Sequence, residues 1–208
     1  MLFVNEQGVL FQENNREFHF DKNYYEDEKF RKLSLSQLRL NDVEFFNCEF
    51  NGVVLEKSTF NSCRFEKCSF KNCDLSVSKI NNSSFLDVKF ENCKLIGIDW
   101  TKICQPVKLD FLKCKLNDCI FFNMDLRSTN FISCEVHNSD FEQTNLSKGD
   151  LTFSDFLNSS FSNTNLSYAD FTDARNYRIN PAQNNIRKAK FSLPEAIALL
   201  DQWDIIIK

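Results

Sequence analysis

The stretch FNSCRFEKCSFKNC, residues Phe60–Cys73, repeats a single arrangement at intervals of five residues. Phe60, Phe65 and Phe70 are spaced by five, and each of three cysteines stands two residues before a large apolar residue. These cysteines are Cys63, Cys68 and Cys73. A period of five matches neither the 3.6-residue period of a helix nor the two-residue period of a strand. The stretch therefore predicts a repeat fold, and it raises the question of whether the cysteines carry chemistry.

The same spacing extends along most of the chain. From Leu35 to Trp100 a large apolar residue occupies every fifth position, and after a slip of one residue the series resumes at Phe111 and runs to Phe171. We call these 27 residues the centres of the repeats; 14 are Phe and 10 are Leu. The residue two positions before each centre is mostly small. Each unit therefore has one large and one small inward residue, as in a solenoid whose repeats stack on their neighbours.

The late repeats carry a family resemblance. They read SDF at 139–141, TNL at 144–146 and ADF at 169–171. These units resemble the A(D/N)LXX consensus of pentapeptide-repeat proteins, and the match covers roughly residues 33–173. The resemblance implies an all-β solenoid, a right-handed quadrilateral parallel β-helix with four pentapeptides in each square coil. Twenty-seven units then make about seven coils, stacked at the ~4.8 Å spacing of paired strands.

The pattern also predicts the division of the chain. We expect three segments: an N-terminal cap at 1–32, the repeat domain at 33–173, and a C-terminal helix and strand at 174–208 that form a dimerisation extension. The frame slip lies within 101–110 and contains Pro106, which cannot donate to a strand ladder. We expect a small bulge or loop there. The sequence LPEAIALLDQW predicts an amphipathic helix beginning near Pro194, followed by a short apolar strand.

The cysteines are predicted to be packing residues. Eight of the nine occupy the small inward position, and Cys104 lies in the frame slip. With twenty residues in each coil, the three cysteines of the opening stretch fall on three different sides and cannot converge on one metal ion. One column of cysteines stacks from coil to coil, but its parallel Cβ directions are poor disulfide geometry. This column is Cys73, Cys93, Cys114 and Cys134. Buried thiols behave as small hydrophobes; metal binding and redox chemistry are the alternatives.

The sequence shows no catalytic, cofactor or metal constellation. His19 lies in the expected cap and His137 follows a repeat centre, so both are predicted to be surface histidines. The carboxylates are spread over an open rod, where general acid–base pairing is disfavoured. With four glycines and a net charge of −4, phosphate-binding loops and direct nucleic-acid binding are also disfavoured. The first residues are not typical of a signal peptide and no apolar run is long enough for a membrane span, so we expect a cytoplasmic protein.

The C-terminal sequence narrows the resemblance. NYRINPAQNNIRKAKFSLPEAIALLD, residues 176–201, is similar to the ends of Qnr-like pentapeptide-repeat proteins, notably the loop-poor members of Gram-positive bacteria. The resemblance implies a homodimer joined through the C-terminal end. It also implies binding to a type II topoisomerase (DNA gyrase or topoisomerase IV) by DNA mimicry, with protection from quinolones as a further implication. The predicted dimerisation residues are Ile197, Leu199, Leu200, Trp203, Ile205 and Ile207.

The distribution of charge favours DNA mimicry in one half of the rod. Residues 116–173 contain nine acidic residues but only Arg127 and Lys148 as basic ones, whereas 35–115 contain ten acidic and twelve basic residues. We therefore expect an acidic partner-binding face in the coils nearest the dimer junction. Its predicted residues are Asp110, Asp125, Glu135, Asp140, Asp150, Asp155 and Asp170. The alternatives are that Asp and Asn suit the turns of the repeat, and that the rod is a structural scaffold or interaction module for another partner.

Overall fold

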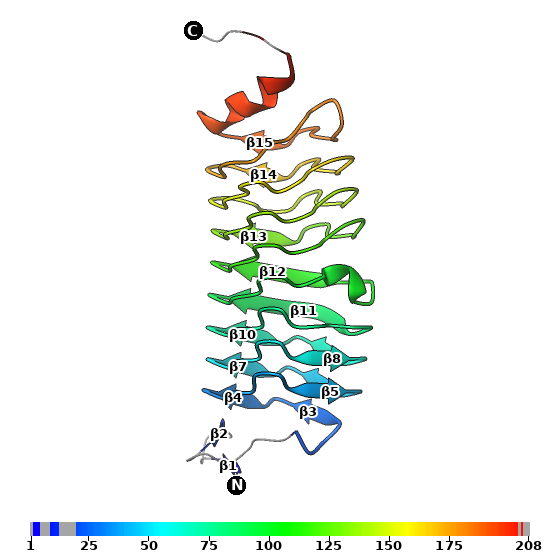
Figure 1. Ribbon diagram of the computed structural model, residues 1–208, viewed down its shortest axis with the longest axis vertical. Coiled ribbons are helices and arrows are strands. Elements are labelled where there is room, and N and C mark those ends of the chain that lie inside the picture. The colour runs from blue at the N-terminus through cyan, green and yellow to red at the C-terminus, as the bar shows by residue number, and fades with distance from the viewer. Residues whose placement is uncertain (1, 5–8, 13–19, 204, 206–208) are drawn as a thin grey trace.

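The computed structural model describes residues 2–4, 9–12, 20–203 and 205. These residues form a rod of stacked square coils, with the two ends of the chain at opposite ends of the rod (Figure 1). Within the coils, paired strands are parallel and their partners are about twenty residues apart, as in the pairing of Phe50 with Phe70. From Phe30 to Phe191 the chain makes about eight turns. The predicted quadrilateral parallel β-helix is therefore confirmed, with about one coil more than expected.

Most of the strands are three residues long and lie on three sides of the square. One side carries β4 (Lys29–Arg31), β7 (Glu49–Asn51), β10 (Ser69–Lys71), β12 (Lys108–Leu112), β13 (Asn130–Ile132), β14 (Asp170–Phe171) and β15 (Lys190–Phe191). A second carries β3 (Tyr24–Glu26), β6 (Glu44–Phe46) and β9 (Arg64–Glu66), and a third β5 (Arg39–Asn41) and β8 (Thr59–Asn61). The longer β11 (Ser84–Glu91) spans a corner and pairs with β9, β10 and β12. Elsewhere the coils are joined by isolated parallel bridges.

We name the four sides A to D in chain order. The centres are Phe50, Phe70, Phe90, Phe111, Phe131, Leu151 and Phe171 on side A, and Leu35, Leu55, Leu75, Leu95, Leu116, Val136 and Phe156 on side B. They are Leu40, Phe60, Ile80, Trp100, Phe121, Phe141 and Phe161 on side C, and Phe45, Phe65, Phe85, Leu126, Leu146 and Leu166 on side D. Every centre is buried.

The centres form ring stacks along the axis of the rod. The rings of Phe50 and Phe70 are nearly parallel, at 4° with centroids 4.4 Å apart, while Phe50 meets Phe65 of the neighbouring column edge to face. A fully buried Phe or Leu side chain stabilises the fold by about 1.5–3 kcal/mol relative to its exposed state. Stacked and edge-to-face pairs add roughly 0.5–1.5 kcal/mol each. The five-residue spacing of large residues is therefore what holds the rod together.

The small inward residues join successive coils by hydrogen bonds. The Cys73 N–H donates to Cys93 Sγ at 3.4 Å, and that thiol donates to the Phe70 carbonyl at 3.3 Å. Serine makes the same contacts elsewhere: the Cys134 N–H donates to Ser154 Oγ at 2.8 Å. All nine cysteines are free, and all except Cys104 are buried, which confirms the packing role predicted from their positions. Within the described ranges no group of three or more His, Cys, Asp or Glu residues is arranged to hold a metal ion.

The frame slip is a local bulge, as predicted. The 3₁₀ helix η1 (Trp100–Lys102) follows Asp99, whose carboxylate accepts a hydrogen bond from the Thr101 N–H at 3.0 Å. The Trp100 indole is fully buried and contacts four rings from three sides of the square. The register between β11 and β12 shifts between Leu86 and Val88. One inserted residue is thus absorbed at a corner, and the coils resume above it.

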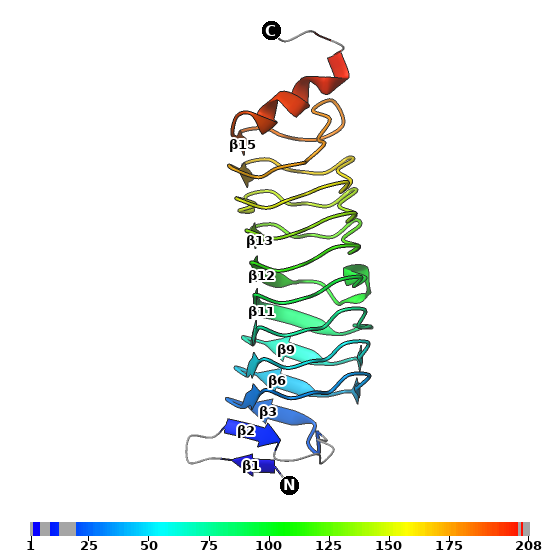
Figure 2. The same ribbon diagram turned by 60° about the vertical axis from the view of Figure 1, so that its left-hand side comes forward.

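The coils extend beyond the expected 33–173 domain at both ends. Tyr25 and Phe30 are buried centres within the predicted cap, and Phe191 stacks on Phe171 with centroids 5.3 Å apart within the predicted C-terminal extension. Below the first coil, β1 (Leu2–Val4) and β2 (Val9–Gln12) form an antiparallel hairpin, and β2 continues the ladder on β4 (Figure 2). His19 lies outside the described residues. The proposed cap is therefore this hairpin rather than all of 1–32.

A helix follows the last coil, as expected, but it is a 3₁₀ helix, η2 (Glu195–Trp203). It crosses the C-terminal end of the rod (Figure 2). Of the short apolar strand expected after it, only Ile205 is described, and it belongs to no strand; Ile207 lies outside the described residues. Neither helix in the described part of the chain offers a span sufficient for a lipid bilayer.

Candidate protein-binding surface

The seven predicted acidic residues do not share one face. Asp110, Asp150 and Asp170 lie on side A, where the carboxylates precede stacked centres. Glu135 and Asp155 lie in register on side B. The other two, Asp125 and Asp140, are on sides D and C. Five of the seven therefore fall on two adjacent sides, which we call the A–B surface, while the remaining two face elsewhere.

Side A spaces its carboxylates with an amide. Asn130 lies between Asp110 and Asp150; its Nδ2 donates to Asp110 Oδ1 at 2.8 Å, and its Oδ1 accepts from the Asp150 N–H at 3.2 Å. Neither of these two carboxylates has an ion pair among the described residues. At the upper end of the side, Lys190 Nζ lies 2.8 Å from Asp170 Oδ2. Asp110 and Asp150 are therefore the carboxylates of this acidic stretch of side A that lack an ion pair, and Lys89 lies in register with Asp110 one coil below.

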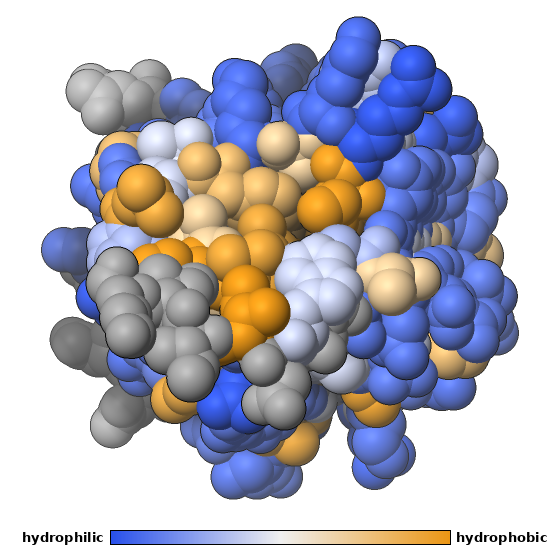
Figure 3. Space-filling model, turned by 90° about the horizontal axis from the view of Figure 1, so that it is seen from above, coloured by the Kyte–Doolittle hydropathy of each residue, from blue (hydrophilic) through white to orange (hydrophobic). Residues whose placement is uncertain are grey.

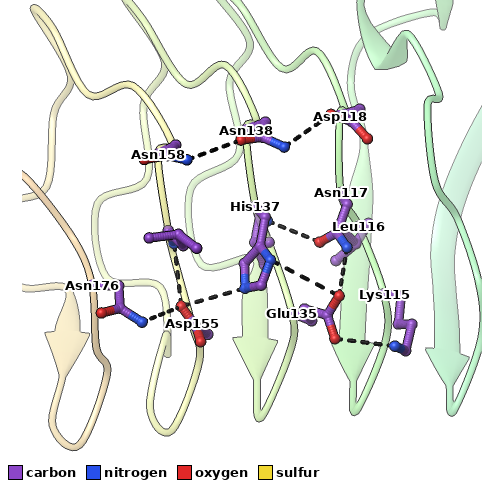
Figure 4. A network of polar contacts seen from close by, with 12 residues as sticks. Lys115, Leu116, Asn117, Asp118, Glu135, His137, Asn138, Asp155, Asn158 and Asn176 are labelled. Atoms are coloured by element: carbon purple, nitrogen blue, oxygen red, sulfur yellow. Dashed lines mark hydrogen bonds and ion pairs between the residues drawn. The ribbon is translucent and has the colours of Figure 1, made fainter.

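Side B carries a polar network that spans several coils (Figure 4). Glu135 accepts from the Asn117 amide and pairs with Lys115 Nζ at 3.1 Å. Asn117 and Lys115 lower the pKa of Glu135 against the opposing effect of its burial. One coil above, burial alone would raise the pKa of Asp155, but the Asn176 amide, His137 and Arg175 together lower it. Both carboxylates are therefore held in the charged form.

His137 is not the free surface histidine that its place in the repeat suggests. A quarter of its side chain is exposed, and the ring lies between the two carboxylates of side B (Figure 4). Its Nδ1 lies 4.0 Å from Glu135 Oε1 and its Nε2 lies 3.4 Å from Asp155 Oδ1. His137 directly follows the centre Val136, and its side chain points along the rod axis toward the carboxylate of the next coil. An alignment of the sequence in rows of twenty residues, one row for each coil, places His137 beside Glu135 and Asp155.

The acidic coils are less acidic than the sequence count suggests. Of the nine acidic residues in 116–173, four have a Lys or Arg partner within the described residues: Asp125, Glu135, Asp155 and Asp170. The coil that follows them, residues 174–193, contains five basic residues and no acidic one. These are Arg175, Arg178, Arg187, Lys188 and Lys190. The expectation that acidic coils adjoin the C-terminal end is therefore wrong, because a basic coil lies between them.

Some of the carboxylates have a structural role in the turns. Oδ1 of Asp140, Asp150 and Asp170 accepts a hydrogen bond from the N–H two residues further on, at 2.8–3.0 Å. Asn145 and Asn165 make the same contact. This local bond is a typical Asx turn. The turn explains why Asp or Asn precedes the centre. Because both residues make this bond, it does not explain why Asp rather than Asn stands at a given position.

The C-terminal end of the rod is apolar. Ile197, Trp203 and Ile205 are 41%, 52% and 54% exposed, and Leu199 and Leu200 are half-buried. Leu193, which was not among the predicted residues, is the most exposed large apolar side chain of those that the structure describes, at 78%. Apolar residues gather on this end when it is viewed along the rod (Figure 3). Below η2 a cavity of about 410 Å³ is lined by polar residues that include Arg178, Glu195 and Asp201.

The fold and these surfaces define a parallel β-solenoid protein with a square cross-section, whose exposed sides offer binding surfaces. The sequence profile named "Pentapeptide repeat region" matches residues 43–105 and 102–171. The chain belongs to the pentapeptide-repeat family, as its five-residue period predicts. No curated protein sequence matches it.

Solved structures of QnrB1, "a plasmid-mediated fluoroquinolone resistance protein", have a similar fold. A trypsin-treated variant of QnrB1 is 18% identical, with a TM-score of 0.62, over 89% of this chain and 91% of that chain. Full-length QnrB1 is also 18% identical, with a TM-score of 0.53, over 88% of this chain and 90% of that chain. At this level of identity the likeness shows the fold, and the predicted resemblance to Qnr-like proteins is confirmed at that level.

Proposed function

We propose that the protein is a cytoplasmic homodimer that binds a type II topoisomerase, DNA gyrase or topoisomerase IV, by imitating duplex DNA. The observation that carries this proposal is the A–B surface, on which five carboxylates lie in two columns over four coils, with Asn130 between Asp110 and Asp150. Hydrogen bonds and basic neighbours keep Glu135 and Asp155 charged, against the opposing effect of their burial. The likeness to QnrB1, whose structures are described as those of a fluoroquinolone resistance protein, supports the choice of partner. Protection of the enzyme from quinolones is part of the proposal.

The apolar C-terminal end supports the dimer. Leu193, Ile197, Trp203 and Ile205 are exposed together at the end of the rod, where burial against a second copy would remove apolar surface from water. A two-fold contact between identical ends is self-complementary and closes the assembly. In such a dimer the acidic coils of each copy are separated from the junction by the basic coil 174–193.

A supercoiling assay tests the function. The protein is expected to inhibit supercoiling by gyrase, and to reduce the inhibition of gyrase by a fluoroquinolone. The double variant Asp110→Asn/Asp150→Asn removes the two unpaired charges of side A and keeps their hydrogen bonds, so it should weaken both effects several-fold. The matched control is Asp42→Asn/Glu44→Gln, which removes two charges from the distal coils. Absence of any effect of the wild-type protein on gyrase and topoisomerase IV would overturn the proposal.

The second candidate is a scaffold or interaction module with another protein partner. It is favoured by the turn contacts of Asp140 and Asp150, and by the basic coil that offsets part of the acidity. An affinity capture that returns a specific partner other than a topoisomerase, with no effect on supercoiling, would select it.

A further inference from the structure

The corners of the rod require a left-handed backbone. Among the described residues, 28 that are not glycine have positive φ, and nearly all of these follow a centre by two positions. Most are Asn, Asp, Ser or Lys, and Asn and Asp are the residues that tolerate this region best after glycine. Three are bulky apolar or aromatic residues: Val77, Phe153 and Tyr168, with φ of 58°, 61° and 62°. At these three corners a bulky side chain therefore stands where the left-handed backbone favours Gly, Asn or Asp.

Packing does not account for these three residues. Phe153 is 59% exposed, Val77 53% and Tyr168 48%, so each keeps about half or more of its side chain in water. The backbone strain of a β-branched or aromatic residue at positive φ is therefore not offset by burial in the rod. Strained residues of this kind are concentrated at functional sites. An aromatic side chain that is strained and exposed in the free protein is suited to burial in a partner.

Two of the three frame the acidic part of side A. Phe153 lies at the A–B corner, two residues after the centre Leu151. Tyr168 lies at the D–A corner, at the other end of side A, three residues before the centre Phe171 of the next coil. Between the two corners, Asp150 pairs in register with Asp170.

The surroundings of the two rings differ. The Phe153 N–H donates to the Thr172 carbonyl at 3.1 Å, and the Phe153 ring has no aromatic or cationic partner among the described residues. On the same side, two coils below, Leu112 is 37% exposed and pairs with the half-buried Ile132. Lys188 Nζ lies 5.4 Å from the centroid of the Tyr168 ring. Phe153 is thus the freer of the two.

We propose that Phe153 and Tyr168 are aromatic anchors of the contact with the topoisomerase, on either side of the Asp150 and Asp170 carboxylates. The proposal rests on the function proposed above. The partner surface it requires is cationic, to meet the carboxylates, with an apolar recess for Phe153 beside the cations. Aromatic residues at the centre of a contact, surrounded by polar ones that exclude water, carry much of the binding energy in protein interfaces. Lys188 already stacks on Tyr168, and an arginine or lysine of the partner would do so on the open face.

Val77 is a matched control within the same chain. It has the same backbone strain and a similar exposed fraction, but it lies on a B–C corner about four coils nearer the N-terminus. Replacement by Asn relieves the strain at any of the three positions, because Asn already occupies many of these corners. Stability and binding are therefore expected to change in opposite directions at Phe153 and Tyr168, but not at Val77.

The experiment compares Phe153→Asn/Tyr168→Asn with Val77→Asn, measuring thermal unfolding and the Kd for purified gyrase. We expect both variants to unfold at or above the wild-type temperature, the side A variant to bind at least tenfold more weakly, and the Val77 variant to bind as the wild type does. Phe153→Tyr should keep most of the affinity, since it retains the ring.

The outcomes separate the inference from the function on which it rests. If the wild type binds and the folded side A variant binds equally well, the anchors are refuted while the topoisomerase remains the partner. If the Val77 variant loses affinity to the same extent, corner strain rather than an aromatic contact is responsible, and the anchors are again refuted. If wild-type protein binds neither gyrase nor topoisomerase IV, both the proposed function and its anchors fail.

Discussion

His137 Nε2 lies 3.4 Å from Asp155 Oδ1, so a histidine of one coil contacts a carboxylate of the next. Asp155 accepts hydrogen bonds from Arg175 Nε at 3.0 Å and from Asn176 Nδ2 at 2.8 Å, and only 13% of its side chain is exposed. A largely buried carboxylate with three side-chain partners joins the acidic coils to the basic coil above them. This contact is therefore expected to contribute to the stability of the C-terminal half.

The stabilising effect of Asp155 should depend on pH. Its pKa in the folded protein is lowered, so the charged form stabilises the fold above the pKa of the unfolded chain, about 3.9, and the effect is lost as pH falls through the folded value. We expect Asp155→Asn to lower the free energy of unfolding by roughly 1–3 kcal/mol at pH 7. The difference from wild type should shrink below about pH 4. Urea unfolding at several pH values measures this.

Asp42→Asn is the control for that series, because Asp42 has no side-chain hydrogen bond or ion pair among the described residues. Its stability should follow that of the wild type at every pH. A deficit for Asp155→Asn that stayed constant from pH 7 to pH 3 would show that its charge is not the source of the effect.

The reactivity of the nine thiols should depend on whether they are buried in the rod. Cys104 is exposed, whereas the other eight cysteines are buried, and burial raises the pKa of Cys119 to about 12. Because the thiolate is the reactive form, a thiol reagent should titrate one cysteine in the native protein and nine after unfolding. Cys104→Ser should leave none reactive in the native state. Rapid reaction of several thiols in the folded protein would contradict the buried columns.

Gly149 occupies a small inward position where a larger residue does not fit. A Cβ at this position would lie 2.7 Å from the Thr129 carbonyl oxygen, which belongs to the backbone of the coil below. We expect Gly149→Ala to destabilise the protein by about 1–3 kcal/mol through overpacking. The comparison is Gly97→Ala, where the nearest atom would be 3.9 Å away and only the positive φ opposes the change. Thermal unfolding should rank Gly149→Ala as the less stable variant; the reverse order would show that the coils relax readily.

The apolar C-terminal end predicts the oligomeric state. The chain has a mass of 24.4 kDa, and light scattering should give about twice this value. Ile197→Glu/Ile205→Glu places charges on the exposed apolar end and should give a monomer. Val77→Glu, an equally exposed position on a distal coil, should remain a dimer. A wild-type protein that is monomeric at micromolar concentration would contradict the dimer.

The five-residue period predicts the interior of the rod because each centre has to fill the same axial space. The ends were less predictable for a specific reason. Ile186 and Phe191 keep the spacing of Phe171, but Asn176 and Pro181 stand at the two intervening positions, and the inward residue is Tyr177. The sequence therefore predicts a separate extension where the structure has the last coil. The acidic stretch that the sequence predicts, residues 116–173, therefore ends before the five basic residues of this coil.

The surface was less predictable than the interior, because it depends on contacts between coils. The place of His137 between two acids follows only from the twenty-residue stacking. The strain at Phe153 follows only from the backbone, since the sequence shows a phenylalanine outside the frame but not its positive φ. Asp125 and Asp140 belong to the predicted acidic face, but the square cross-section places them on sides D and C.

Competition with DNA tests the central claim most directly. Fluorescently labelled protein is bound to gyrase and titrated with a duplex long enough to fill the DNA-binding surface of the enzyme. If the A–B surface imitates DNA, the duplex should displace the protein completely, and Asp110→Asn/Asp150→Asn should be displaced at lower DNA concentration than Asp42→Asn/Glu44→Gln. Binding that persists at saturating DNA, or no binding to gyrase or topoisomerase IV at all, would contradict the account.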